Sequence, residues 1–203
     1  MPVYLIRHGQ SEFNAVARDG IDPLIYDAPL TALGRSQADQ ARKNITDLNI
    51  QHVICSPLTR AVQTALRIFK DDVPITIEVG HREMVCNSCD VGRHPHKLSR
   101  DFPNLSFDHL EDHWWHKGPE NDHGVPHEPE DIFTRRIEDF VARLEAAAPE
   151  TTTPKATTPE TPILETPILV PFAARPLAIV GHGLFFQGLV GRLMDNCEIV
   201  RYK

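Results

Sequence analysis

Short apolar runs and longer amphipathic segments alternate along most of the chain. The apolar runs are rich in valine and isoleucine, which is typical of buried strands, and they occupy residues 3–6, 52–55, 75–79 and 177–180. Between them, apolar side chains such as Leu33, Ala41 and Ile45 recur near the helical period. This spacing predicts helices over residues 32–48, 58–69, 131–148 and 184–194.

The order of these elements predicts the fold class. Strands that alternate with helices of this length are joined by right-handed crossovers into a mostly parallel sheet. We therefore predict an α/β fold, a three-layer sandwich whose mostly parallel central sheet is flanked by helices. Residues 11–27 are expected to form a loop or short helix, Thr31 to cap the helix that follows, and residues 198–202 to form an edge strand.

Two segments interrupt the alternation. Residues 84–129 have no sustained period and hold seven of the eleven histidines, so we expect an inserted cap over the carboxyl ends of the strands. Residues 149–176 are rich in threonine and proline, a composition that disfavours helices and ladders, and we expect a mobile loop. The length of 203 residues fits a single domain, residues 1–203, that contains both segments.

Charge and cysteine content narrow the function classes. A net charge of -7 disfavours nucleic acid and anionic membranes as partners, although clustered arginines could still bind a small anion. The four cysteines are too scattered for a disulfide scaffold. No secretory leader precedes Val3, and no apolar run approaches the roughly 18 residues of a membrane helix. We expect a cytoplasmic protein, and nothing in the sequence indicates its oligomeric state.

Polar side chains follow each predicted strand where that strand ends. Arg7 and His8 follow the first, Arg60 opens the helix after the second, Glu83 comes after the third, and His182 after the fourth. Since the carboxyl ends of parallel strands share one edge of a sheet, we expect these side chains to form one pocket. A guanidinium fork matches phosphate oxygens, and a neutral imidazole is a nucleophile near pH 7. The pocket is therefore expected to bind and attack a phosphate.

The same residues lie in sequence blocks that resemble a known family. The chain is similar to the histidine phosphatase superfamily, in its phosphoglycerate-mutase-like branch. The blocks are Arg7-His8-Gly9 with Asn14, Leu30-Thr31-x-x-Gly34-x-x-Gln37-Ala38, Ser56-Pro57-Leu58-x-Arg60-Ala61-x-Gln63-Thr64-Ala65, Arg82-Glu83 and Gly181-His182-Gly183. The resemblance covers residues 1–83 and 177–194 and is weak or absent over residues 84–176.

The resemblance implies a role for each residue. His8 would attack phosphorus and become a phosphohistidine, and Glu83 would protonate the leaving oxygen and then deprotonate water. Arg7, Arg60 and a protonated His182 would surround the phosphate oxygens. Asn14 and Gly183 would also bind the phosphate. Two guanidiniums and an imidazolium supply the charge, so we expect no metal and no cofactor.

Within the family, the sequence favours a phosphatase that acts on a small phosphorylated metabolite. Mutases carry a substrate-binding segment after the catalytic Glu and an Asn two residues after the second His. Here Met84 follows Glu83 and Leu184 stands at the Asn position. Mutase-type transfer remains the alternative, and a catalytically silent protein that binds phosphorylated ligands is the second.

Several residues of the cap have two interpretations. The basic side chains either reach a second anionic group of the substrate or are solvated surface charges; they are Arg82, Arg93, Lys97 and Arg100. The aromatic side chains are expected to pack in the core rather than clamp a ligand; they are Phe107, Trp114 and Trp115. A zinc site is a less favoured alternative, made by Cys86 and Cys89 with His94 and His96, or with His109, His113 and His116.

Overall fold

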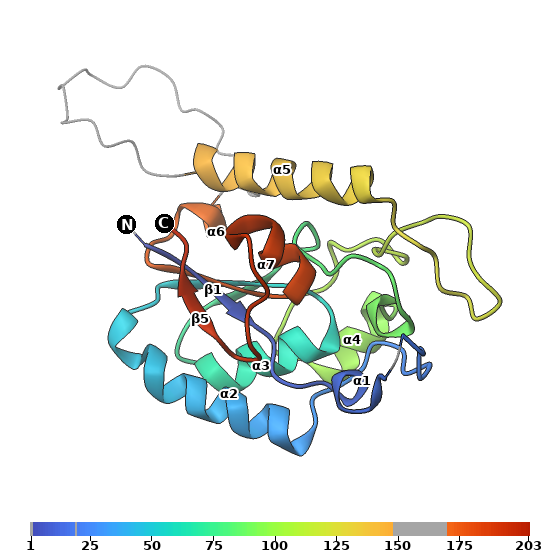
Figure 1. Cartoon of the computed structure of the whole chain (residues 1–203). Helices are drawn as coiled ribbons and strands as arrows, with labels where there is room; N and C mark the ends of the chain where they lie inside the picture. Colours follow the sequence, from blue (N-terminus) through green and yellow to red (C-terminus); the bar gives the residue numbers. More distant parts are fainter. Residues whose placement is uncertain (1, 19, 148–169) are drawn as a thin grey trace.

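The computed structural model describes residues 2–18, 20–147 and 170–203, and the core is one mixed sheet between two helical layers (Figure 1). Its strand order is β3-β2-β4-β1-β5. Four strands run parallel and β5 is antiparallel to β1. The strands are β1 Val3–Arg7, β2 His52–Cys55, β3 Ile75–Ile77, β4 Leu177–Gly181 and β5 Ile199–Arg201. The predicted α/β fold with a mostly parallel sheet is confirmed.

Strand register brings residues from distant parts of the sequence together. β4 pairs with β1 on one side and β2 on the other, so that Arg7 lies opposite Gly181 and Cys55 opposite Val180. The next residues continue the alignment, because His8 N donates to Gly181 O at 2.9 Å and Ser56 N donates to Val180 O at 3.1 Å. The carboxyl ends of the three central strands therefore form one edge.

Side chains alternate between two cores on either side of the sheet. In β4, Leu177 and Ile179 face one hydrophobic cluster, while Ala178 and Val180 face the other. Helices α2 (Ala32–Ile45) and α3 (Thr59–Phe69) cover one face and pack on each other. The other face is covered by α5 (Glu130–Ala146), α6 (Val170–Ala173) and α7 (Gly183–Val190), as Figure 1 shows. This is the predicted three-layer arrangement.

Two helices differ from the sequence prediction for local reasons. The α-helical part of residues 32–48 ends at Ile45, and a 3-10 turn, η1 (Thr46–Leu48), continues it. The predicted helix 184–194 ends at Val190, because Gly191 takes a left-handed conformation with φ 74° and its N–H binds Gln187 O. Leu33 was expected on the buried face of α2 but is 53% exposed, since the face of α2 that enters the core carries smaller residues such as Ala38 and Ala41.

The cap, residues 84–129, is irregular but well packed. It contains a 3-10 turn, η2 (Ser88–Asp90), and one helix, α4 (Pro95–Asp101), and the short α1 (Glu12–Val16) lies near it (Figure 1). Phe107 and Trp114 are buried in the core beneath α2 and α3, with Trp115 packed against it, so the expected packing role of these aromatics is confirmed. Most of the Thr/Pro-rich segment 149–176 lies outside the described residues, although its end forms α6 rather than a loop.

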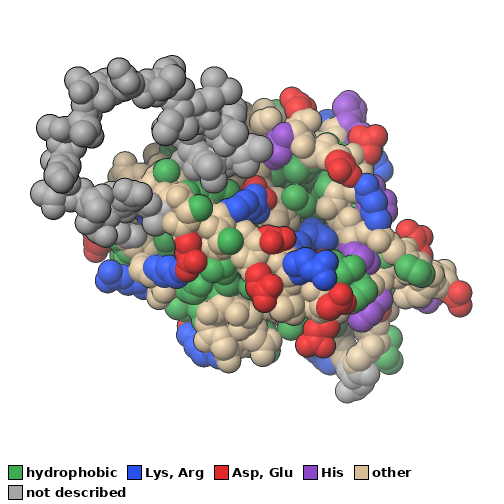
Figure 2. All heavy atoms as spheres, turned by 90° about the horizontal axis from the view of Figure 1, so that it is seen from above, with side chains coloured by type: hydrophobic (Ala, Val, Ile, Leu, Met, Phe, Trp, Pro, Cys, Tyr) green, Lys and Arg blue, Asp and Glu red, His purple; other side chains and the backbone are tan. Residues whose placement is uncertain are grey.

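The outer surface of α5 is polar. Figure 2, which looks onto this helix, shows acidic and basic side chains interspersed. The exposed charged residues there include Glu130, Asp131, Arg135, Glu138 and Asp139. Within the described part of the chain, no helix has the length and apolar character needed to cross a membrane.

Candidate active site

The five side chains expected to form a pocket are connected through short contacts at the carboxyl edge of the sheet. The rings of His8 and His182 lie with centroids 5.2 Å apart. Arg60 Nε is 3.2 Å from His8 Nε2. Glu83 binds the first amides of α7, directly after His182, and a Cβ on Gly183 would lie 3.3 Å from Arg7 Nε. Residues separated by as many as 175 positions therefore meet at one place.

The hydrogen bonds of His8 determine which nitrogen carries the proton. Nδ1 is 2.7 Å from Gly9 O, which can only accept, so Nδ1 carries the hydrogen. Nε2 faces Arg60 Nε, which can only donate, so Nε2 presents a lone pair. The ring is buried, and burial together with the charges of Arg60 and Arg7 holds the pKa of His8 well below its usual value. His8 is therefore a neutral imidazole whose Nε2 can act as a nucleophile.

The loop after His8 is held by residues of two other sequence blocks, 30–38 and 56–65. Gly9 N donates to Thr64 Oγ1 at 3.1 Å, and Gln10 N donates to Gln37 Oε1 at 2.8 Å. Gly34 lies so close that a Cβ there would be 2.1 Å from Gln10 O. Gln37, Thr64 and Gly34 of those blocks thus fix the backbone that carries His8.

Replacing Gly34 by alanine is expected to destabilise the fold. Alanine has the better helix propensity by about 1 kcal/mol, but overpacking against backbone costs about 1–3 kcal/mol or more, and the Gln10 carbonyl cannot rotate away like a flexible side chain. The unfolding temperature should fall by several degrees, measured by circular dichroism. Ser36→Ala, on the exposed side of the same helix, is the control, and an unfolding temperature of Gly34→Ala at or above that of the control would contradict the close approach.

Arg60 is held on both sides of its guanidinium. It is 2% exposed, and Nη2 forms a 2.8 Å ion pair with Asp90 while Nη1 donates to Cys89 O at 2.5 Å. Asp90 is fixed in turn, because its Oδ2 accepts from Cys86 N at 3.3 Å and Asn87 N at 3.1 Å. The cap thus supplies the carboxylate that orients a core arginine.

Arg7 presents a hydrogen-bond donor to the pocket. Nη1 donates to Met194 O at 2.5 Å, whereas the buried Nε has no acceptor among the described residues. Asn14 lies at the start of α1, where its Oδ1 accepts from Ser11 N at 3.2 Å in a capping box. This bond assigns the amide orientation and leaves Nδ2 as a donor.

The environment of His182 bears on its protonation state. Its Nε2 is 2.7 Å from Ser56 Oγ, and the ring is fully buried. Burial, with the nearby charge of Arg60, holds the pKa of His182 well below its usual value. This shift disfavours the protonated form of the ring, because a desolvated imidazole beside a guanidinium gains a proton less readily, and the protonated His182 stays a prediction for the complex with a phosphate.

The Glu83 carboxylate is anchored to the first turn of α7. Oε2 accepts from Leu184 N at 3.1 Å, and Oε1 accepts from Phe185 N at 3.2 Å and Met84 N at 3.1 Å. Burial and the neighbouring carboxylate of Asp90 raise the pKa of Glu83, while Arg60 and the amides oppose them. The net shift is upward, which is the direction that a proton donor needs.

A buried charge network supports the segment that carries Glu83. Arg136 donates to the carbonyl oxygens of Gly80, Arg82 and Glu83. Its guanidinium also pairs with Glu128 at 2.8 Å. Sequence reasoning missed Arg136, Glu128 and Asp90, since no motif or spacing distinguishes them from surface charges.

The other candidate binding residues of the cap lie in different environments. Arg93 donates to Asp27, Asp101 and Thr59, and these bonds favour a structural role in the cap over contact with a second anionic group. Lys97 and Arg100 are exposed. The described residues contain no group of three or more side chains placed to hold a metal ion, and burial raises the pKa of the Cys86 thiol to about 11.

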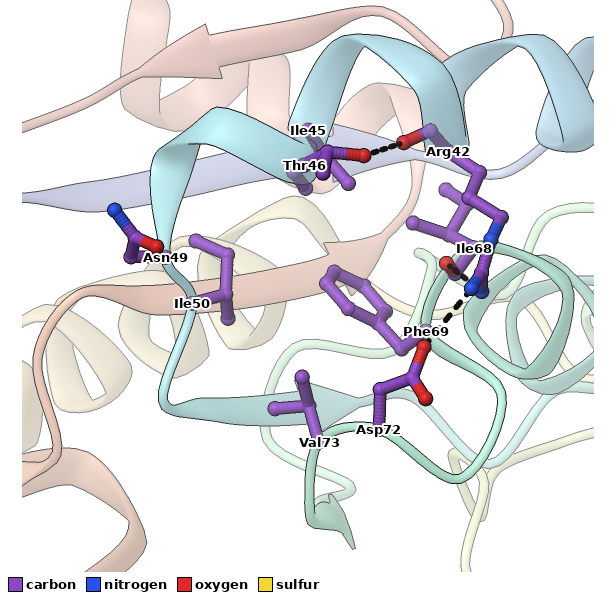
Figure 3. A pocket seen from close by; sticks show the side chains of 9 residues that line it. All are labelled: Arg42, Ile45, Thr46, Asn49, Ile50, Ile68, Phe69, Asp72 and Val73. Atoms are coloured by element: carbon purple, nitrogen blue, oxygen red, sulfur yellow. Dashed lines mark hydrogen bonds and ion pairs between the residues drawn. The ribbon is translucent and has the colours of Figure 1, made fainter.

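One cavity lies at the opposite edge of the sheet. Figure 3 shows it between the ends of α2 and α3, where Ile50 and Val73 precede β2 and β3. Its volume is about 220 Å³, and Arg42 crosses it to bind Ile68 O at 3.0 Å and Asp72 at 2.9 Å. Since it lies at the amino ends of the strands, it is separate from the site of His8.

Comparison with known proteins agrees with this geometry. The sequence model of the histidine phosphatase superfamily (branch 1) matches residues 3–154. The chain belongs to that family. The chain is 31% identical over 145 residues to the adenosylcobalamin/alpha-ribazole phosphatase of Escherichia coli K12. The matched residues make up 71% of this chain and 66% of that protein. It is also 42% identical over 65 residues to a probable phosphoglycerate mutase of Proteus mirabilis, covering 32% and 29%.

Solved structures share the fold. A putative alpha-ribazole-5'-P phosphatase of E. coli superposes with a TM-score of 0.58 at 20% identity, covering 98% of this chain and 88% of that one. A mycobacterial glucosyl-3-phosphoglycerate phosphatase gives 0.58 at 21% identity, covering 98% and 90%. The chain matches less than two thirds of the length of the two sequence relatives, so their activities are not transferred directly.

Proposed function

We propose that this family member is a phosphomonoester hydrolase that acts through a phosphohistidine on a small phosphorylated metabolite. The observation that carries the proposal is the His8 ring, neutral and with its Nε2 lone pair facing the guanidinium of Arg60. A nucleophile beside a permanent cation suits an electrophile that is itself anionic. The relatives named as phosphatases support the same reaction class.

In the first step, His8 Nε2 forms a bond to phosphorus and the bond from phosphorus to the leaving oxygen breaks. Nδ1 keeps its hydrogen bond to Gly9 O, which stabilises the positive charge that develops on the ring. In the resting site Arg60 Nε occupies the position in front of Nε2 at 3.2 Å. This donor has to shift onto a phosphate oxygen when the substrate enters, and it then stabilises the transition state.

The remaining donors surround the transferred phosphoryl group. Arg7 Nε and Asn14 Nδ2 lie on segments that flank the nucleophile. His182 contributes its imidazole ring, and Gly183 allows the chain to pass Arg7 because a Cβ would lie 3.3 Å from Nε. The two guanidiniums supply the positive charge, so the proposed reaction uses no metal and no cofactor.

Glu83 donates a proton in the first step of the proposed reaction and accepts one in the second. As the leaving oxygen departs, the carboxyl donates its proton to it and becomes a carboxylate, which the amides of α7 and Met84 stabilise. In the second step the carboxylate removes a proton from water, the water oxygen bonds to phosphorus, and the bond to Nε2 breaks. Inorganic phosphate leaves and Glu83 is protonated again.

Replacing Asp90 by asparagine is expected to move the pH dependence of turnover. The charge of Asp90 raises the pKa of Glu83, so removing that charge lowers this pKa and Glu83 loses its proton at a lower pH. The falling, high-pH limb of kcat/KM should therefore shift to lower pH, measured with an alkyl phosphate. Asp112→Asn, which removes an exposed carboxylate of the cap, is the control. A limb that stays in place or moves upward would exclude this coupling.

The sequence features that disfavour a mutase also support hydrolysis. Leu184 stands where mutases carry an Asn, and Glu83 is followed by Met84-Val85-Cys86, without the Tyr that mutases carry three residues after the Glu and without their substrate-binding segment. The free thiols of all four cysteines, each within the described residues, are compatible with a cytoplasmic location, which we also propose.

The test is a panel of phosphate esters with the full chain. Release of inorganic phosphate from several small esters, with an acid-labile phosphoenzyme after rapid quenching, is expected. Isomerisation of 3-phosphoglycerate in the presence of 2,3-bisphosphoglycerate would instead indicate mutase-type transfer. Binding of phosphate esters without turnover at micromolar enzyme would indicate the silent ligand-binding alternative, and either result would overturn the proposal.

A further inference from the structure

Ser56 is a buried residue that the proposed reaction does not use. It directly follows β2, and its N–H donates to Val180 O at 3.1 Å, so it stands at the carboxyl edge of the sheet. Its Oγ lies 2.7 Å from His182 Nε2, and both residues are fully buried. Since β4 lies between β2 and β1, Ser56 and His8 stand on opposite sides of the strand that leads to His182.

The contact between Ser56 and His182 matters because a neutral imidazole donates a hydrogen bond through only one of its two nitrogens. Burial and the nearby charge of Arg60 hold the pKa of His182 well below its usual value, which favours the neutral ring before a phosphate binds. A phosphate dianion offers only acceptor oxygens. The neutral ring can therefore bind a phosphate oxygen only through the nitrogen that carries its hydrogen.

The contacts of the Ser56 hydroxyl assign this hydrogen to Nδ1. Leu58 N can only donate and approaches Ser56 Oγ at 3.5 Å, so among the residues that the structure describes the hydroxyl hydrogen has His182 Nε2 as its acceptor. A hydrogen on Nε2 would leave two groups unpaired, the hydroxyl hydrogen and the lone pair of Nδ1, which has no partner among the same residues. A hydrogen on Nδ1 leaves only Nδ1–H itself. Since buried polar groups are rarely left unpaired, the second arrangement is favoured.

Nδ1 is the nitrogen of His182 that remains for a ligand, because Ser56 occupies Nε2. The ring centroids of His182 and His8 are 5.2 Å apart, so the ring lies beside the nucleophile. His8 is itself only 3% exposed, and Arg60 Nε has to leave its Nε2 when a phosphate enters. Burial of Nδ1 in the free protein is therefore a property that His182 shares with the nucleophile, and it does not separate the ring from the site.

We propose that Ser56 is a positioning residue, whose hydroxyl donates to His182 Nε2, fixes the hydrogen of the neutral ring on Nδ1 and directs this donor toward the transferred phosphoryl group. The same hydroxyl oxygen can accept from Nε2–H of a protonated ring, so Nδ1 stays a donor in both charge states. Ser56 itself does not touch the reacting atoms. The role of Ser56 in turnover rests on the proposed phosphatase function, whereas the position of the hydrogen on His182 does not.

The first test locates the hydrogen without turnover. In the full chain labelled with nitrogen-15 in its histidine rings, a ring nitrogen that carries a hydrogen resonates well upfield of one that carries a lone pair. The signals of His182 are identified by their loss in His182→Asn. At about pH 8, above the ordinary histidine pKa, wild-type Nδ1 should carry the hydrogen and Nε2 should not. In Ser56→Ala both signals should shift toward each other, because the preference is lost. A wild-type hydrogen on Nε2, or unchanged signals in Ser56→Ala, would overturn the proposal.

The second test asks whether Ser56 acts through His182. Ser56→Ala should lower kcat/KM for 4-nitrophenyl phosphate by at least about tenfold in the wild-type chain. The loss should be less than about twofold in His182→Asn, whose amide offers a donor near the Nδ1 position without help from a hydroxyl. Micromolar enzyme keeps the slow variants measurable. Thr76→Val is the matched control, since it removes a hydroxyl that lies 2.9 Å from the Nε2 of another histidine, His52, and it should retain wild-type turnover.

The outcomes separate the proposal from the function on which it rests. Equal losses on Ser56→Ala in the wild-type and His182→Asn chains would show a merely structural role and overturn the positioning role. Failure of the wild type to release phosphate would overturn the proposed function and leave the assignment of the hydrogen on His182 standing.

Discussion

Replacing His8 by alanine is expected to lower kcat for 4-nitrophenyl phosphate by at least about 10³-fold, because no other group can form the phosphoenzyme. His182 is the nearest imidazole, with its centroid 5.2 Å away, but its Nε2 is bound to Ser56 and it lacks the Gly9 carbonyl that orients the His8 ring. The measurement is steady-state release of 4-nitrophenolate, together with the acid-labile phosphoenzyme in a quenched-flow experiment.

The matched control for this variant is His127→Ala, since His127 is an exposed histidine of the cap. It should retain wild-type turnover. The unfolding temperature of His8→Ala is measured alongside and is expected to fall by a few degrees, because the buried ring leaves a cavity and Arg60 Nε loses its acceptor. A folded His8→Ala protein with turnover within tenfold of the wild type would eliminate His8 as the nucleophile.

Replacing Glu83 by glutamine is expected to reduce kcat by an amount that depends on the leaving group. General acid catalysis contributes about 10²–10⁴-fold, and the full loss should appear with an alkyl phosphate, whose leaving oxygen needs a proton. With 4-nitrophenyl phosphate the first step should lose much less, since the 4-nitrophenolate ion leaves without protonation. The comparison is made by measuring kcat/KM for ethyl phosphate and 4-nitrophenyl phosphate with both enzymes.

Glu83→Gln also affects the stability of the fold. The experiment therefore has to separate the loss of the proton donor from the loss of stability. Glutamine offers one acceptor oxygen where the carboxylate offers two, so one of the three amides that bind Glu83 loses its partner. This loss lowers the unfolding temperature but acts on all substrates alike. Glu120→Gln, exposed in the cap, is the control. Equal losses for both substrates would refute the proton-donor role.

The parts of the site that sequence reasoning found share one physical property. Arg7 ends β1, and His8 and His182 directly follow β1 and β4, so parallel pairing fixes their relative positions once the strands are recognised. Short apolar runs identified those strands, and apolar side chains that recur at the helical period of 3.6 residues identified the helices between them. Fold class and the convergence of the pocket therefore followed from local signals.

What the sequence did not reveal depends on long-range contacts. Asp90 reaches Arg60 from an irregular turn, and Glu128 meets Arg82 and Arg136 across the base of the cap. Neither contact has a period or spacing that could be recognised in advance. The lowered pKa of His182 was not foreseen for a related reason, since a pKa depends on burial and on neighbours that only the folded chain brings together.

The attachment of Glu83 to α7 has a consequence for engineering. Its carboxylate is bound by the amides of Leu184 and Phe185 in α7 and by the amide of Met84 at the very start of the cap, so the position of Glu83 does not depend on the rest of the cap sequence. Grafting residues 91–127 from a relative of different specificity keeps Met84, Asp90 and Glu128, and should therefore exchange the substrate while the contacts of these three residues are inherited. A graft that begins earlier would remove Asp90 and with it the ion pair that orients Arg60.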